Sequence, residues 1–555
     1  MKRAGHMLRA VVSFGVLFLS VHGFCAEAPV DIGVLTPFYR NMQLQGHLFG
    51  MGLMEIPDYV LAADIDFRYQ KKPGMKLEIP FVDSFTINRF LGGYREDWLK
   101  KFNLWDDQLG VRSIDYVIRK GDGTLQFRPE LIQRRIAPYI DAGYSPANIT
   151  IALENVPWDI AASPESGAWG QKSPPANQQE WREVISHFAS DLKDYLGASA
   201  SAVSFKTGVE YDTKASFHGN ASDFFAYYEA TDQGLHSVLP SAALSSGEFT
   251  GIGECPTQVT TCVYATSDFI RVALTRHLSL SDVPRSLNSF LNRGNPMPSA
   301  AVTRAVESYS RLPPHTVVEI HQFGLLNQPF GAEDGKNPGA LEANFEFQAL
   351  MGLWEKLKPR RVFHWGGFVE AGDLKFLNGS GLLRLVLDHY VGYRAARLSP
   401  EEAGRNRVFA RTELMAVEFK NSTTSALIIS SFNPTMDLGK RTIRVDLPTT
   451  PRSRSAKTIR YRNSDNVFSA IRSDLANEHN LKHEFSNCSS CLGTPLSMAS
   501  DAESGRAMLH KNWEKYREIM KRDLKWNLDD HDVSVNGDQL VVALESNELM
   551  VIELQ

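Results

Sequence analysis

Two glutamates close to the ends of strand-like runs are the residues best suited to chemistry in this sequence. Glu210 ends the alternating run "AVSFKTGVE", and Glu319 lies inside the apolar run "TVVEIHQFG". A facing pair of carboxyl groups can divide the work of glycoside hydrolysis, because one donates a proton to the leaving oxygen while the other attacks or stabilises the anomeric carbon. The apolar setting of Glu319 suits a rigid nucleophile. The looser setting of Glu210 suits a residue that exchanges protons.

Three residues near the ends of earlier runs could bind a ligand at the same place. Asn155 and Trp158 in "ENVPWD" follow one run, and an indole can stack on the C–H face of a sugar. Arg89 lies on the first run and could orient a carboxylate, including that of a uronic acid. Each also has a structural explanation, an internal salt bridge for Arg89 and a core contact for Trp158. Glu154 is a third acid of this kind and competes with Glu210 for the acid role.

Three further candidates come from the two last runs. His321 follows Glu319 by two residues and therefore points to the same side of its strand. It could hydrogen-bond a substrate or be a satisfied structural histidine. His364 and Trp365 in "FHWGGF" end the last run and could form a wall of the pocket.

Eight candidate strands between about residues 81 and 395 predict the framework that positions these side chains. They are "SFTINRFLG", "VRSIDYVIR", "NITIALE", "AVSFKTGVE", "AALSSGEF", "PRSLNSF", "TVVEIHQFG" and "RRVFHWGGF", and helical patterns separate most of them. Repeated strand–helix alternation indicates an α/β fold with a parallel sheet, and eight units predict a (β/α)8 TIM barrel. An open doubly wound sheet is the alternative, but no glycine-rich dinucleotide fingerprint follows the first strand.

The pattern changes after residue 395. Segment 396–555 alternates apolar and polar residues and ends in "VSVNGDQLVVALESNELMVIELQ", where Asn-Gly-Asp indicates a turn between strands. We expect a β-sandwich domain here, with a polar, partly helical insertion at about 452–530. Residues 29–80 contain a few strand-like runs that complete either the barrel or the sandwich.

Composition and the amino terminus restrict the class of protein. The 555 residues include 59 basic and 64 acidic side chains, so no basic excess indicates a nucleic-acid partner. The segment 1–28 begins with basic residues, continues with an apolar run at 11–19 and ends in small residues, which is the order of a secretory signal peptide. That apolar run is too short to span a bilayer, and no later stretch qualifies as a transmembrane segment. We therefore expect an exported protein, periplasmic or extracellular, of unspecified oligomeric state.

Four cysteines remain after the signal, in two close pairs. Export implies an oxidising compartment, so we expect the disulfides Cys255–Cys262 and Cys488–Cys491. A four-sulfur zinc site is the alternative, although the pairs lie far apart and no further ligand cluster flanks them. No His, Asp or Glu cluster has metal-ligand spacing, and the sequence predicts neither a cofactor nor a metal.

The segment from about residue 80 to 400 resembles the retaining family 39 glycoside hydrolases. "VEYDTKASFHGNASDFFAYYEATDQGLHSVLP" resembles their fourth strand and following helix, and "HTVVEIHQFG" resembles their nucleophile strand. Upstream, "GDGTLQFRPELIQRRIAPYIDAGYSPANITIALENVPW" resembles their second helix and third strand. The resemblance implies a barrel with a β-sandwich beside it, Glu210 as acid/base, Glu319 as nucleophile and a carbohydrate substrate.

The resemblance also marks where this chain departs from the family. Val209 stands where the family has an asparagine that binds the substrate 2-hydroxyl, and Tyr211 replaces the usual proline. His218 takes the place of a family tryptophan, so Tyr211 and His218 join the candidate substrate-binding residues. Loss of the asparagine implies an unusual substrate, a substitute donor such as Asn155 or His321, or diminished catalysis. A catalytically silent glycan-binding protein and a polysaccharide-assembly component on the same barrel are therefore alternatives.

Overall fold

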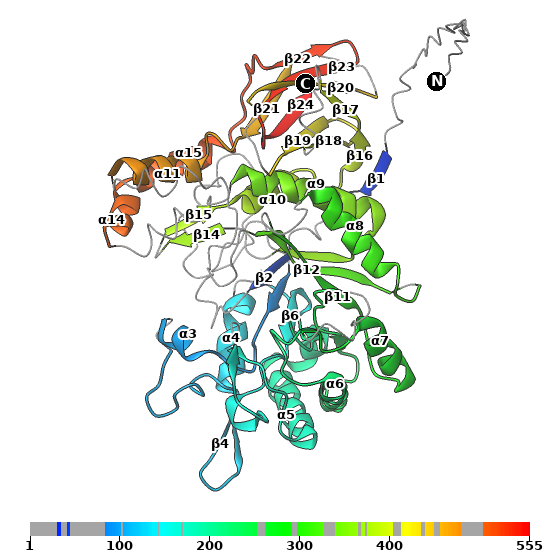
Figure 1. Cartoon of the computed structure of the whole chain (residues 1–555), viewed down its shortest axis with the longest axis vertical. Coiled ribbons are helices and arrows are strands. Elements are labelled where there is room, and N and C mark those ends of the chain that lie inside the picture. The colour runs from blue at the N-terminus through cyan, green and yellow to red at the C-terminus, as the bar shows by residue number, and fades with distance from the viewer. Residues whose placement is uncertain are drawn as a thin grey trace, which may run out of the picture.

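The computed structural model describes most of the chain from Val30 onward, and Figure 1 shows the arrangement. The described residues are 30–34, 41–44, 84–101, 104–141, 144–167, 170–251, 261–290, 297–314, 316–326, 339–364, 368–371, 374–402, 412–434, 439–448, 455–478 and 503–554. The predicted signal peptide and three of the four predicted disulfide cysteines lie outside them, so the export prediction and both disulfide pairings stay predictions. None of the described helices is long and apolar enough to cross a membrane.

Eight parallel strands form one sheet. In spatial order they are β10 (Ala243–Ser245), β9 (Ser204–Lys206), β6 (Ile149–Ala152), β3 (Phe85–Ile87), β2 (Asn41–Leu44), β13 (Arg361–His364), β12 (Val318–Leu326) and β11 (Val283–Phe290). Neighbouring strands follow chain order except at one place, where the first strand of the sheet, β2, pairs with the last, β13. The two edge strands, β10 and β11, meet through the isolated parallel bridge Phe249–Arg285 and through hydrogen bonds such as Ser281 N–H to Leu244 O (2.9 Å).

One predicted strand of this sheet is wrong. "VRSIDYVIR" contains β4 (Val117–Arg119), which forms an antiparallel hairpin with β5 (Leu125–Phe127) outside the parallel sheet. An Asp-Gly turn between them, with Gly123 at φ +86° and the Asp122 carboxylate accepting the Thr124 N–H, directs the chain back on itself. The missing eighth strand is β2, which has only four residues. Arg89 consequently follows the second strand of the sheet and not the first.

Helices follow most of these strands and cover the sheet with one apolar face. They are α3 (Glu96–Lys101), α4 (Glu130–Asp141), α5 (Gln178–Leu196), α6 (Ala221–His236), α7 (Thr266–Thr275), α8 (Pro298–Tyr309), α9 (Ala340–Lys356) and α10 (Gly379–Asp388). In α5 the buried residues Trp181, Ile185, Phe188 and Leu192 recur every three or four positions, the spacing of one helix face. Asn177 caps that helix by accepting the N–H groups at positions 179 and 180.

The carboxyl-terminal part contains two antiparallel sheets packed face to face. The larger sheet has the order β1 (Val30–Val34), β16 (Arg394–Leu398), β18 (Glu413–Lys420), β19 (Ser425–Phe432), β24 (Leu549–Leu554) and β21 (Ala456–Tyr461). The smaller has β17 (Pro400–Glu402), β20 (Arg441–Asp446), β23 (Gln539–Leu544) and β22 (Val533–Asn536). Residues 29–80 thus contribute β1 to this part and β2 to the parallel sheet.

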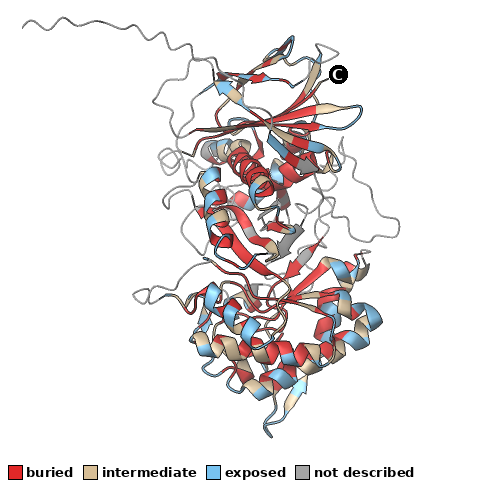
Figure 2. Cartoon of the chain, turned by 90° about the vertical axis from the view of Figure 1, so that its right-hand side faces the viewer, coloured by how far each residue is buried: buried red, intermediate tan, exposed pale blue. Residues whose placement is uncertain are grey.

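Helix α9 lies between the two parts of the molecule and is buried along nearly its whole length, as Figure 2 shows. Strand β19 packs on both sides: Leu427 and Ile429 join the core between the antiparallel sheets, whereas Ala426 and Ile428 join the core that includes α9. The alternation of a strand places successive side chains on opposite faces, so one strand links both cores.

Three helices occupy the region predicted as an insertion. They are α11 (Val467–Glu478), α14 (Glu503–Lys511) and α15 (Trp513–Arg522), and they pack on a hairpin of β14 (Phe368–Ala371) and β15 (Leu374–Leu377). Phe376 of β15 contacts the rings of Trp513 and Tyr516 edge-on. The predicted range 452–530 also includes β21, a strand of the larger sheet.

Candidate active site

Three non-glycine residues with left-handed backbone follow three adjacent parallel strands. Arg89 (φ +55°) comes after β3, Asn155 (φ +55°) after β6 and Glu210 (φ +58°) after β9. This conformation is costly for residues with a Cβ, and such strain concentrates at functional sites. All three are candidates that the sequence singled out, and they lie at the carboxyl ends of the strands, where parallel barrels carry their active sites.

The backbone of Glu210 is fixed against the end of the next strand. Its N–H donates to the carbonyl oxygen of Glu248 (2.8 Å), and Val209 forms a parallel bridge with Glu248. Its carboxyl group is hydrogen-bonded by Ser286 of β11. Burial raises the pKa of Glu210 to about 8, and the neighbouring acids Asp212 and Glu248 add to the rise. A carboxyl group of this kind keeps its proton at neutral pH and can donate it.

Glu154 and Glu248 join Glu210 in a group that we call the strand-end acids. Glu154 accepts the backbone N–H of Arg89 at 2.9 Å and is 1% exposed. Burial raises the pKa of Glu154, while Arg89 and Lys206 oppose the rise. Charge interactions couple Glu154 to Glu248 and Glu210 to both, so the three carboxyl groups share one site.

Lys206 and His321 are the basic side chains that face Glu248. Lys206, the last residue of β9, forms an ion pair with Glu248, and both side chains are fully buried. His321 Nδ1 lies 3.3 Å from Glu248 Oε1. The sequence analysis missed Lys206 and Glu248, although Glu248 stands in "AALSSGEF" as Glu210 stands in its own run, an acid just past the end of a strand.

Asn155 and Trp158 belong to the loop after β6, and Tyr211 of the loop after β9 fixes that loop. The Asn155 N–H donates to the hydroxyl oxygen of Tyr211 (2.7 Å), and its side-chain amide donates to Gly93 O (3.4 Å). The indole N–H of the half-buried Trp158 donates to Tyr94 O at 3.1 Å. Tyr211 is itself buried and packs on Phe217, Phe224 and Tyr227. Tyr211 therefore holds Asn155 in position from the protein interior.

Asp115 fixes the same loop and was not among the predicted residues. Its carboxylate accepts the N–H of Gly93 and the N–H of Trp158, each at 2.7 Å. Burial raises the pKa of Asp115 to about 7, against the lowering effect of these two hydrogen bonds. Its position inside "VRSIDYVIR", mistaken for a core strand, concealed it.

Glu319 lies away from the carboxyl ends of the strands, contrary to its predicted position at the rim. It is the second residue of the nine-residue strand β12 and pairs with Arg361, the first residue of β13, so it lies at the amino ends. Its Oε1 accepts from Arg360 Nε (2.8 Å) and Arg361 Nε (2.6 Å), and its Oε2 lies 3.0 Å from His321 Nε2. Burial alone would raise the pKa of Glu319, but His321 and the two arginines hold it well below its usual range.

The remaining candidates lie at the surface, in the interior or outside the described residues. His218 is exposed and pairs with Glu165 through Nδ1 at 2.9 Å. The Arg89 guanidinium is buried and lies 5.2 Å from the ring centroid of Trp98. His364 ends β13, and only its backbone is described, while Trp365 lies outside the described residues.

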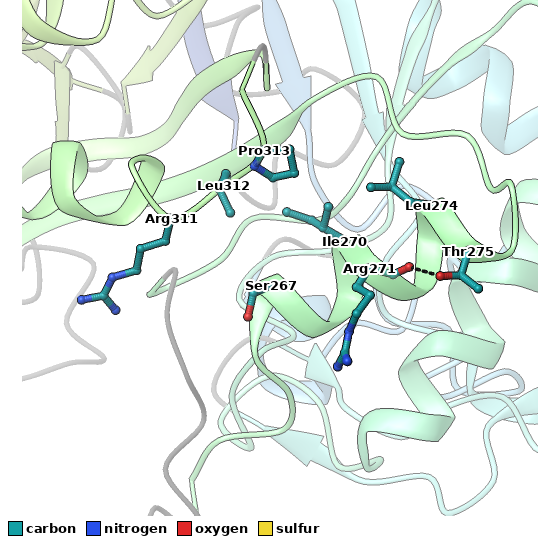
Figure 3. Close-up of a pocket in the computed structure, with 8 residues that line it drawn as sticks. All are labelled: Ser267, Ile270, Arg271, Leu274, Thr275, Arg311, Leu312 and Pro313. Atoms are coloured by element: carbon teal, nitrogen blue, oxygen red, sulfur yellow. Dashed lines mark hydrogen bonds between the residues drawn. The ribbon is translucent and has the colours of Figure 1, made fainter.

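A surface groove of about 550 Å³ lies elsewhere, beside α7 and the turn after α8 (Figure 3). Its lining residues are Ser267, Ile270, Arg271, Leu274, Thr275, Arg311, Leu312 and Pro313. None of the strand-end acids contributes to it, so it is separate from the candidate active site.

Comparison with known proteins supports the fold. No family profile matches the chain. The structure is similar to that of the GH39 enzyme from Xanthomonas axonopodis pv. citri, with a TM-score of 0.56, 12% identity and coverage of 96% of this chain and 95% of the other. A monomeric β-xylosidase from Caulobacter crescentus CB15 gives a TM-score of 0.54 at 12% identity, with coverage of 95% and 98%. A bacterial orthologue of human α-L-iduronidase gives 0.54 at 11% identity, with coverage of 95% and 82%.

One characterised relative is similar in sequence. An α-1,4-L-rhamnosidase from Formosa agariphila is 21% identical over 316 residues, which are 53% of this chain and 60% of that enzyme. The chain thus matches less than two thirds of the rhamnosidase. At these identities the solved structures establish a shared fold, that of glycoside hydrolases with a strand–helix domain and an additional β-domain.

Proposed function

We propose that this protein is an exported glycoside hydrolase that cleaves an oligo- or polysaccharide, with Glu210 as its general acid. The observation that carries the proposal is the carboxyl group of Glu210, placed at the end of the fourth parallel strand with a pKa raised to about 8. Export is supported by the sequence of residues 1–28 alone.

The eight parallel strands close into a barrel in this proposal. Pairing of the first strand with the last is the strand order of a (β/α)8 barrel, whereas an open doubly wound sheet reverses order at an internal switch point. The bridge Phe249–Arg285 supports closure between β10 and β11. Glu154, Glu210 and Glu248 then converge on one mouth of the barrel.

The chemistry assigned to Glu210 is transfer of its proton to the glycosidic oxygen. The bond between that oxygen and the anomeric carbon breaks as the second carboxylate bonds to the carbon, and the protonated oxygen leaves as an alcohol. The Glu210 carboxylate then accepts a proton from the incoming water, whose oxygen replaces the second carboxylate on the anomeric carbon. Asp212 and Glu248 favour the protonated form before the reaction because two further negative charges disfavour a third. Retention of configuration, implied by the resemblance to family 39, is part of the proposal and needs a second carboxylate.

The assignment of Glu319 as the nucleophile rests on the sequence alone. Its position at the amino ends of the strands and its two arginine partners give that role no support, because a nucleophile must reach the anomeric carbon. The proposal therefore rests on Glu210, and the second carboxylate is left to experiment.

Hydrolysis of phenyl glycosides tests the proposed function. The compared proteins include a rhamnosidase, a xylosidase and an iduronidase orthologue, so the panel holds phenyl glycosides of L-rhamnose, D-xylose and L-iduronic acid. We expect the wild-type protein to release phenol from at least one, and proton NMR to show the first-formed sugar in the configuration of the substrate. Absence of hydrolysis across this panel and across bacterial polysaccharides would contradict the proposal, and an inverted product would contradict retention.

A glycan-binding protein without turnover is the second candidate, and two observations favour it. Val209, which is 8% exposed, replaces the family asparagine, and Glu319 lies at the amino ends of the strands. Isothermal titration calorimetry with the same sugars separates the two candidates. Binding that persists without any product favours this second function.

A further inference from the structure

Glu248 occupies a backbone position beside Glu210 that leaves it little freedom. Its N–H donates to Gly208 O (2.9 Å), and its carbonyl oxygen accepts the Glu210 N–H (2.8 Å). The two residues therefore hold each other by main-chain hydrogen bonds, while the Glu248 side chain is 0% exposed. A carboxyl group this deeply buried does not meet a substrate directly, but its charge acts on Glu210 at short range.

Two basic side chains keep the Glu248 carboxylate charged. Burial alone would raise the pKa of Glu248, but Lys206 and then His321 lower it below its ordinary value. A buried carboxylate keeps its charge only when such partners replace water. Lys206 comes from β9 and His321 from β12, so the carboxylate is held from both sides of the sheet interior.

His321 is held in turn by Glu319. Its two ring nitrogens face two carboxylates, Nδ1 toward Glu248 (3.3 Å) and Nε2 toward Glu319 (3.0 Å), and its ring lies 4.4 Å from that of Phe363. These contacts fix the plane of the imidazole. Glu319 is itself anchored by Arg360 and Arg361, and Arg360 also pairs with Asp282 just before β11 (2.8 Å).

We propose that Glu319, His321 and Glu248 form a positioning chain on the amino-end side of Glu210, in which each side chain holds the next and Glu319 acts through His321 instead of on a substrate. This positioning chain begins beside the arginines that anchor Glu319 at the amino ends of the strands. It ends at the strand-end acids at the carboxyl ends. Its role rests on the proposed function of Glu210 as proton donor. The charge that it fixes at Glu248 adds to burial and to the charge of Asp212, which also favour the protonated form of Glu210.

The charged groups around this positioning chain determine whether its loss favours the protonated or the ionised form of Glu210. Asp212 and Glu154 also face Glu210, Ser286 hydrogen-bonds it, and Lys206 is the basic group nearest to Glu248. Replacement of Glu248 by Gln removes one negative charge and leaves Lys206 uncompensated, and both changes favour the ionised form of Glu210. Loss of Glu319 acts only through His321, so its effect on Glu210 has the same direction and a smaller size.

Infrared titration of Glu210 tests the positioning chain without requiring hydrolysis of a substrate. The stretching band of the protonated carboxyl group is followed against pH, and the part that disappears in Glu210→Gln is assigned to Glu210. We expect the midpoint to fall by about one pH unit in Glu248→Gln and by less in Glu319→Gln, which keeps the size of the side chain. Unchanged midpoints in both variants would overturn the proposal.

Chemical rescue separates a positioning role of Glu319 from that of a nucleophile. We expect Glu319→Gly to lose only about twofold in kcat at pH 7, because a Glu210 pKa still above 7 leaves at least half of the acid protonated, with no recovery in azide and no glycosyl azide formed. Glycosyl azide formation would show that Glu319 attacks the anomeric carbon and would overturn the proposal. Should the glycine variant not fold, Glu319→Gln carries the same prediction for kcat.

Glu548 provides the matched control. It is a fully buried glutamate of the β-domain held by Arg460 and Arg462, so Glu548→Gln removes a similar ion pair far from the strand ends. In Glu548→Gln we expect the infrared midpoint of Glu210 and the kcat to equal those of the wild type. Shifted midpoints in Glu248→Gln and Glu319→Gln, in a protein that hydrolyses no glycoside, would support the chain and refute the proposed function.

Discussion

Glu210 combines a strained backbone with a carboxyl group surrounded by other acids, and the two features serve one purpose. The left-handed φ of +58° places the residue at the turn where β9 ends, within reach of Ser286 from the opposite edge strand. Burial and the charges of Asp212 and Glu248 then keep the proton on the carboxyl group. Position and protonation are therefore set by different neighbours, and each can be tested separately.

The pH dependence of hydrolysis follows from the raised pKa of Glu210. A general acid is active in its protonated form, so the rate is high below pH 8 and falls as the pH rises through about 8. We expect kcat/KM for a phenyl glycoside to show a basic limb with that midpoint. A limb that stays in place when Glu210 is replaced by Gln would belong to another group.

Gly93 is a position where a small change should disturb the site. Its φ of +69° suits glycine, and an added Cβ would lie 2.6 Å from the carbonyl oxygen of Asn155. We expect Gly93→Ala to reduce the free energy of unfolding by about 1–3 kcal/mol and to weaken binding at the Asn155–Trp158 loop. Denaturant titration and tryptophan fluorescence measure the two effects. Gly121→Ala is the control, because its Cβ would meet nothing within 4 Å.

Among the elements, helix α9 determines how the β-domain is attached. Gln348 donates to Ser430 Oγ (3.0 Å) and to Glu413 O (3.0 Å), and Asn344 accepts from Ser430 Oγ (2.7 Å) and from the Ser431 N–H (3.1 Å). These buried polar groups have partners only because the helix and β19 keep their register. Their loss would leave unsatisfied groups in the core.

Substitution of these amides measures that attachment. We expect Asn344→Ala and Gln348→Ala each to reduce the free energy of unfolding by about 1–3 kcal/mol, as measured by urea titration. Gln233→Ala on the exposed side of α6 removes an amide that bonds Glu229 at the surface, and its effect should be within about 0.5 kcal/mol of zero. Equal effects at buried and exposed amides would contradict this account of α9.

The sequence predicted these elements well where a segment carried its own periodic pattern. Seven of the eight predicted strands contain a strand of the parallel sheet, and the alternation of β20 and β23 predicted the β-domain. Strand β4 was mistaken for a core strand because its sequence does not show that it pairs with β5, and β2 was missed because it has only four residues. Glu319 was misplaced because β12 starts only at Val318 and continues to Leu326, two residues beyond the predicted run, so the glutamate is its second residue.

The sequence could place some candidate site residues together, but not others. The sequence placed Arg89, Asn155 and Glu210 near one another because the ends of parallel strands share one edge, and all three follow strands of the parallel sheet. Glu248, Lys206 and Asp115 were missed because their importance lies in contacts between elements distant in sequence. A short stretch of sequence does not show that a residue is buried or which distant residue it pairs with.

On the scale of the whole molecule, one core extends across α9 from the parallel sheet to the larger antiparallel sheet. Strand β1 pairs with β16, so the amino-terminal segment supplies a strand to the domain formed by the carboxyl-terminal segment. This continuity predicts that both parts unfold together. We expect one calorimetric transition whose calorimetric and van't Hoff enthalpies agree, whereas two separated transitions would contradict a shared core.

The leaving-group dependence of Glu210→Gln tests the central claim most directly. A phenyl glycoside needs a proton on its leaving oxygen and a 2,4-dinitrophenyl glycoside does not, so loss of the general acid should affect them differently. We predict that kcat/KM for the phenyl glycoside falls by about 10²–10⁴-fold in this variant, with a far smaller loss for the dinitrophenyl glycoside and none for either in the exposed control Glu183→Gln. Equal losses for the two leaving groups, or no loss, would contradict Glu210 as the acid.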